Sequence, residues 1–297
     1  LNTTNKIIRS KTAASALNGS LTVQAIFDSW IEEYVNELLP YYDYEASIGQ
    51  AGFITSLSGG SYLVNQNGQE IDQLFFKSLI GAFTLDQIIN NYIHPNQLDA
   101  GTRREDNTNG ILAAGKNYTE MEHKWDEGFG YLYGHEGEDI ATAGSAPSGA
   151  GNLLMKYFKK VNDSDSKDPQ IANDVYNAFI TGRAAIVAKN YTVMEEQSAI
   201  IKQKLSSVIG HYAIHYLSGA ITNIGTSTGA DRLNAFHGLS EGYGFILSLQ
   251  FTNDGSDSPY FTKDEVDTYL AQIDDFYTVE VSTLQSIHDE IKSRFGI

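Results

Sequence analysis

A ten-residue segment occurs twice in near copy, and this repeat limits what the chain can fold into more than any other feature. The first copy is HKWDEGFGYL, residues 123–132, and the second is HGLSEGYGFI, residues 237–246. Both copies keep a histidine, a glutamate four residues later and two glycines in the same places. Short echoes precede the copies in the same order, SLIG at 78–81 and SVIG at 207–210. We interpret this order as the sign of a tandem duplication.

Apolar residues recur at helical spacing through both halves of the chain. The expected helices cover residues 21–39, 69–93, 119–132, 149–161, 171–190, 194–221, 237–246 and 263–294. Only five prolines interrupt the chain, which leaves room for helices of this length. Residues 94–110 predict a polar loop and residues 162–170 a linker, because both are rich in turn-forming and charged residues. Residues 244–251 are the one segment that also suits a strand.

Four amphipathic helices in each half are enough to enclose one core. The predicted fold class is therefore all-α, with two tandem duplicated halves that each resemble a four-helix bundle. The N-terminal bundle is expected over residues 1–162 and the C-terminal bundle over residues 163–297.

The formal net charge of −17 comes from acidic residues spread along the whole chain. Such a surface repels nucleic acid, because phosphate binding needs clustered lysine and arginine, so we expect no nucleic-acid partner. The chain has no cysteine, which excludes disulfides, thiolate metal sites and cysteine nucleophiles. No apolar run approaches the ~20 residues that span a bilayer. The polar first twenty residues resemble a start that was trimmed after export.

The histidine and glutamate of each copy lie four residues apart, and therefore on one helix face. These pairs are His123 with Glu127 and His237 with Glu241; Asp126 adds a further acid in the first copy. Imidazole and carboxylate groups suit zinc, iron, copper or manganese, so the pairs predict a divalent or ferric metal ion as cofactor. A purely structural interpretation, in which each pair hydrogen-bonds within a polar core, remains open.

The motif also carries four glycines inside expected helices, where each costs about 1 kcal/mol relative to alanine. They are Gly128, Gly130, Gly242 and Gly244. We expect each to lie at a close helix crossing or at a helix break. His211 and His215 form a second candidate pair at the same spacing. No HExxH, GxSxG or P-loop motif is present, so we assign no catalytic residue.

Three segments carry a resemblance to a known family: YTEMEHKWDEGFGYL, AFITGRAAI and HGLSEGYGF. They resemble an uncharacterised family of exported bacterial lipoproteins with MEHxWDEAxGY and LSEGxGF motifs, over about residues 27–251. That family is similar to the imelysin-like proteins, which are duplicated helical bundles, exported, linked to iron uptake and marked by a GxHxxE motif. The resemblance implies a periplasmic or cell-surface protein that is lipid-anchored before trimming, with an outer-membrane or envelope transport partner.

The leading function expected from these features is binding of a metal ion or a metal-containing ligand, in iron uptake. One alternative is a polysaccharide or peptide binder of the cell envelope, since the eighteen tyrosines can stack on sugars. A second alternative is a metallopeptidase that uses Glu127 or Glu241 as general base.

Overall fold

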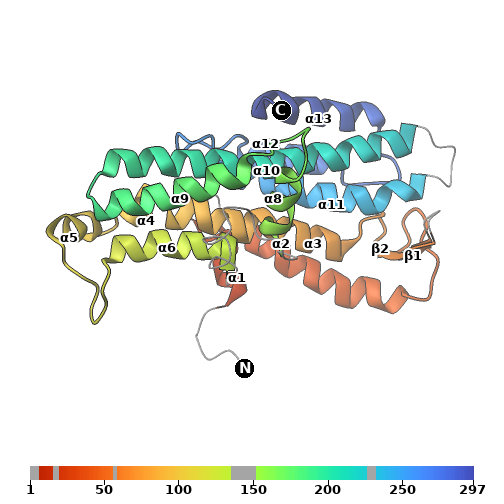
Figure 1. The fold of residues 1–297 in the computed structure, drawn as a ribbon. Helices are drawn as coiled ribbons and strands as arrows, with labels where there is room; N and C mark the ends of the chain where they lie inside the picture. The colour runs from red at the N-terminus through yellow and green to blue at the C-terminus, as the bar shows by residue number, and fades with distance from the viewer. Residues whose placement is uncertain (1–6, 16–19, 56–58, 135–151, 226–231) are drawn as a thin grey trace. The chain divides into compact units, whose positions relative to one another are not determined.

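The computed structural model describes residues 7–15, 20–55, 59–134, 152–225 and 232–297 (Figure 1). Its helices are α1 (Ile8–Lys11), α2 (Ser20–Glu33), α3 (Ile71–Leu79), α4 (Pro95–Leu98), α5 (Arg103–Asn109), α6 (Glu120–Tyr133), α8 (Leu154–Asn162), α9 (Ile171–Val187), α10 (Tyr191–Gly225), α11 (Asn234–Ser248), α12 (Lys263–Gln272) and α13 (Val281–Phe295). The all-α fold class is thus confirmed. Among these helices, none is both long and apolar enough to cross a membrane.

Irregular helical turns extend three of these helices. The chain continues α2 as a π-helical stretch, Tyr34–Leu38, followed by a short 3-10 turn, Leu39–Tyr41. It continues α3 as a longer π-helical stretch, Ile80–Tyr92. Residues 244–251, which also suited a strand, are helical. They form the end of α11 and the 3-10 turn that follows it, Leu249–Phe251.

Three details of the predicted secondary structure are wrong. A β-hairpin, β1 (Gly52–Thr55) paired antiparallel with β2 (Ser61–Val64), was not expected, since four residues are too short for alternation to stand out. The expected polar loop contains α4 and α5. Two features explain why α4 begins here: proline is its first residue, and the His94 side chain accepts a hydrogen bond from the Asn96 amide. The expected last helix is two helices, α12 and α13.

The chain forms two compact units that alternate along the sequence. Unit 1 comprises Leu1–Asn18, Ala82–Val208 and Phe251–Tyr260, and unit 2 comprises Gly19–Gly81, Ile209–Gln250 and Phe261–Ile297. The motif helix α6 belongs to unit 1 and the motif helix α11 to unit 2. The contiguous halves and their tandem duplication stay predictions.

In unit 1, α6 packs on α9 through the fully buried Trp125. Its indole Nε1 donates to the Phe179 carbonyl at 2.9 Å. Gly182 makes room for the ring, because a Cβ at that residue would lie 2.1 Å from Trp125 Cζ2. The predicted capping box of Thr119 and Glu122 begins α6, with each side chain accepting from the other's backbone amide.

In unit 2, α11 packs closely along α3. Small residues on both helices allow the approach: a Cβ at Gly244 would lie 2.4 Å from Lys77 Cβ, and one at Gly81 would lie 2.3 Å from Ser248 Cβ. Aromatic side chains fill the core beside this crossing, and Phe236 and Phe245 are fully buried. The second motif copy is therefore held on a rigid helix pair.

Candidate functional site

The first motif copy presents its histidine and glutamate on one face of α6, as predicted. His123 Nε2 lies 3.8 Å from Glu127 Oε1, and Lys124 Nζ lies 2.5 Å from Glu127 Oε2. The Tyr118 ring stacks on the imidazole with centroids 5.2 Å apart. The histidine side chain is 38% exposed, so a ligand can reach it from solvent.

The second copy repeats this arrangement on α11 with partners from other elements. His237 Nε2 lies 3.6 Å from Glu241 Oε2, and Lys77 of α3 lies 2.9 Å from Glu241 Oε1. Tyr62 of β2 stacks on the imidazole at 4.7 Å. In both copies, then, a tyrosine covers the histidine and a lysine pairs with the glutamate.

The second copy has one further partner, the buried carboxylate of Glu70. Its Oε2 lies 2.7 Å from His237 Nδ1, and its side chain is only 8% exposed. Burial raises the pKa of Glu70, although the hydrogen bond from His237 opposes this change. The same hydrogen bond raises the pKa of His237 above 6.5. The hydrogen bond to Glu70 therefore favours the protonated imidazole and holds His237 in a defined orientation.

The lysine partners bear on the predicted metal site. Each motif glutamate already has an ammonium neighbour, Lys124 or Lys77, which a metal ion would have to displace. Among the described residues, no group of three or more His, Asp or Glu side chains is arranged to hold a metal ion.

Asp126, the further acid of the first copy, is paired with an arginine of a neighbouring helix. It forms an ion pair with Arg183 of α9, whose Nε lies 2.8 Å from Asp126 Oδ1. The same guanidinium reaches Glu122, with 2.9 Å from Nη1 to Oε1. Arg183 thus bridges two acids of α6, and the role of Asp126 as a metal ligand stays a prediction.

The four motif glycines have different surroundings. A Cβ at Gly244 would meet Lys77 Cβ at 2.4 Å and the Ser78 amide nitrogen at 2.8 Å, which is the expected close crossing. A Cβ would lie 2.9 Å from the nearest side-chain atom at Gly128 and 3.1 Å from it at Gly242. At Gly130 nothing in the described part of the chain lies within 4 Å, so the expectation of close packing is wrong there.

The second candidate pair lies on α10. His211 is half-buried, whereas His215 is exposed. The His215 ring lies edge-on to two tyrosines, with centroid distances of 5.5 Å to Tyr212 and 5.1 Å to Tyr216. Ring packing therefore accounts for the position of His215, and metal binding by this pair stays a prediction.

Unit 2 contains a polar cavity of about 520 Å³ that was not predicted from the sequence. Its walls are acids, amides, one serine and two aromatic rings: Ser29, Trp30, Glu32, Glu33, Asn36, Glu37, Asn65, Gln66, Asn67, Gln69, Tyr243 and Asp274. Tyr243 comes from the second motif copy, so α11 contributes to both sites. The acidic run around Glu33 was the signal available in the sequence, but Asp274 joins it only through the fold.

Hydrogen bonds hold the polar side chains of this cavity in place. Asn65 Nδ2 donates to Glu33 Oε1 at 2.7 Å and to Gln69 Oε1 at 3.0 Å. Gln69 Nε2 donates in turn to the carbonyl and carboxylate of Asp274. Burial raises the pKa of Glu33, and the charges of Glu37 and Asp274 raise it further against the hydrogen bond from Asn65. The side chains of the cavity are therefore held in place by hydrogen bonds, while its carboxylates repel one another.

Fold and site together define an all-α protein with two solvent-accessible histidine–glutamate motifs and one acidic, amide-lined cavity. The chain belongs to the family described as Domain of unknown function (DUF4856), whose model matches residues 1–297. The predicted membership of an uncharacterised family is thus confirmed. Neither the curated proteins nor the solved structures contain a significant match to the chain.

Proposed function

We propose that this protein is a binding protein whose cavity in unit 2 takes a positively charged, hydroxyl-rich ligand, and that an amino sugar chain is the ligand class. The observation that carries the proposal is the composition of the cavity wall. Four carboxylates, those of Glu32, Glu33, Glu37 and Asp274, face a space whose lining includes no lysine or arginine. Burial raises the pKa of Glu33 and the charges of Glu37 and Asp274 raise it further; a bound ammonium group would relieve that repulsion.

The amide groups and aromatic rings favour a sugar over a simple amine. Asparagine and glutamine side chains offer both donors and acceptors, which match hydroxyl groups. Trp30 and Tyr243 lie edge to face, 6.3 Å apart, at one side of the cavity. Such rings supply apolar surface for a sugar face. The volume of about 520 Å³ is in the range of small-molecule sites, about 300–1,000 Å³.

A calorimetric titration with glucosamine oligosaccharides tests this function, with the N-acetylated oligosaccharides as a matched neutral ligand. We expect saturable binding of the amino form that weakens as salt is added. Asp274→Asn should reduce affinity about tenfold, since a hydrogen bond to a charged group contributes ~1.5–3 kcal/mol. Asp264→Asn, an exposed acid of α12 outside the cavity, is the control and should bind normally. Equal binding of both sugar forms, or no saturable heat, would contradict the proposal.

Metal binding and a role in iron uptake stay predictions from the motif and its resemblance. The half-exposed imidazoles of His123 and His237 are the feature that supports them. Titration of wild type, Glu127→Gln and Glu241→Gln with iron, zinc, copper and calcium ions separates the alternatives. Heat that saturates in wild type and disappears in the variants would support metal binding, whereas its absence in wild type would leave the motif as a packing device.

Export and attachment to the cell envelope are part of the same proposal and rest on the resemblance to exported lipoproteins. An amino sugar ligand is consistent with that location. Cell fractionation with an antibody to the protein would test it, and recovery in the cytoplasmic fraction alone would contradict it.

A further inference from the structure

A second, smaller cavity of about 190 Å³ lies in unit 1, between α4, α10 and the turn that follows Phe251. Part of its lining is apolar, formed by Ile93, Pro95, Leu98 and Met194. Its lining also includes two charged residues, Lys202 and Asp257. A cavity with both kinds of lining suits a small molecule with an apolar end and a charged end.

The Lys202 side chain is buried, with 3% of its surface exposed. Its ammonium contacts the carboxylate of Asp257. Removing an ammonium from water costs several kcal/mol unless an anion compensates for it. An anion at this place is therefore a requirement of the fold, whatever molecule supplies it.

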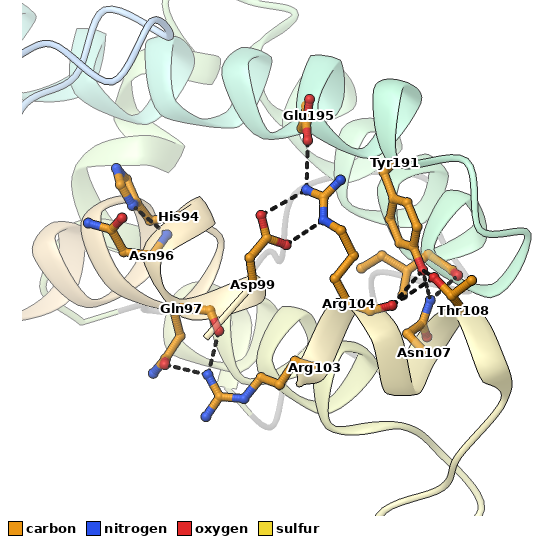
Figure 2. A network of polar contacts seen from close by, with 11 residues as sticks. His94, Asn96, Gln97, Asp99, Arg103, Arg104, Asn107, Thr108, Tyr191 and Glu195 are labelled. Atoms are coloured by element: carbon orange, nitrogen blue, oxygen red, sulfur yellow. Dashed lines mark hydrogen bonds and ion pairs between the residues drawn. The ribbon is translucent and has the colours of Figure 1, made fainter. Parts of the chain in front are cut away.

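A second buried donor, the imidazole of His94, points to the same carboxylate. Its Nδ1 accepts the Asn96 amide at 3.1 Å, so the ring proton is on Nε2 (Figure 2). Nε2 lies 3.4 Å from Asp257 Oδ1 and, within the described residues, has no hydrogen-bond partner. Burial lowers the pKa of His94 and the charge of Lys202 lowers it further, while the charge of Asp257 opposes them; the net effect favours the neutral ring.

Asp257 reaches these donors from an exposed turn. Its side chain is 40% exposed, and its φ of +64° is a left-handed conformation that L-residues adopt at a cost of about 1–2 kcal/mol. Asp254 stabilises the turn by accepting the Ser256 amide at 2.8 Å. The carboxylate that compensates for Lys202 thus comes from an exposed turn and not from the core.

We propose that Lys202 and His94 form a binding site for a small monocarboxylate with a short apolar chain, and that Asp257 occupies the place of the ligand's carboxylate when no ligand is bound. The apolar wall receives the chain of the ligand. One ammonium and one neutral donor match a single negative charge better than a phosphate dianion. Glu195 also lines the cavity, where its carboxylate is paired with Arg104, Nη2 to Oε1 at 2.7 Å, and the same guanidinium also binds Asp99 (Figure 2).

Asp257→Asn provides the test, because asparagine tolerates the left-handed conformation and removes only the competing charge. Propanoate is the probe, propanamide the uncharged control of the same shape, and inorganic phosphate the competing anion. With the full-length protein, NMR signals of the His94 ring should shift saturably with propanoate and not with propanamide. Affinity should be about tenfold or more higher in Asp257→Asn than in wild type, and adding Lys202→Met should abolish it.

A second measurement does not depend on the variant. In wild type, a high concentration of propanoate should accelerate amide hydrogen exchange in residues 254–258, because the ligand releases the turn. Unchanged exchange together with an unshifted His94 signal would overturn the proposal. Tighter binding of phosphate than of propanoate, or equal binding of propanamide, would also overturn it.

Discussion

Gly130 and Gly244 occupy the same place in the two motif copies, and replacing each with alanine should change stability in opposite directions. At Gly130 a methyl group would have nothing in the described structure within 4 Å. The substitution then acts through helix propensity, which favours alanine by about 0.8–1.0 kcal/mol. Gly130→Ala should therefore stabilise the protein by about 1 kcal/mol.

At Gly244 the same methyl group would enter the crossing of α11 and α3. Two of the atoms it would meet are backbone atoms, the Ser78 nitrogen at 2.8 Å and the Lys77 carbonyl carbon at 2.9 Å. Backbone atoms cannot rotate away, so one of the helices must shift, and overpacking of this kind costs about 1–3 kcal/mol. After the gain in helix propensity is subtracted, Gly244→Ala should destabilise by up to about 2 kcal/mol.

Urea and thermal unfolding, followed by circular dichroism, measure both variants against wild type. The two free energies of unfolding should differ by about 1–3 kcal/mol, the overpacking cost at Gly244, with wild type between them. Gly238→Ala is a useful control, because α11 also leaves open space at that residue. If Gly130→Ala and Gly244→Ala both raised or both lowered the free energy of unfolding, the reasoning would be refuted. The effect of each substitution would then not depend on its surroundings in the fold.

Two further changes test contacts in each unit. Gly182→Ala should destabilise by about 2 kcal/mol and change tryptophan fluorescence, because its methyl group would overlap the buried Trp125 ring; an unchanged spectrum and melting curve would contradict this. Glu70→Gln should lower the pKa of His237 towards 6.5 in an NMR titration, because the charged hydrogen-bond acceptor is lost. The raised pKa of His237 stabilises wild type fully below about pH 6.5, and this contribution is lost as pH rises through the folded-state pKa. The stability difference between wild type and Glu70→Gln should therefore shrink as pH rises above about 6.5. A stability difference that does not change with pH would contradict the hydrogen bond between Glu70 and His237.

Local sequence was enough to predict the motif helix α6 and its first turn. The capping box of Thr119 and Glu122 is a short-range signal, because both hydrogen bonds join residues three apart. The shared face of His123 and Glu127 follows from helical spacing in the same way. The β-hairpin was missed for the opposite reason, since each strand has only four residues and depends on its partner for its hydrogen bonds.

The sequence by itself determined the helical class and which motif side chains share a helix face, because both depend on a period of 3.6 residues within one segment. Only the tertiary structure decided what those side chains contact. Glu70, Lys77 and Tyr62 surround His237 and Glu241, although the nearest of them along the chain is 160 residues away from His237. The same is true of the acidic cavity, where Asp274 meets the Asn65 turn. Contacts between distant segments depend on how helices pack, and a motif repeated in the sequence is therefore placed in two different environments by the fold.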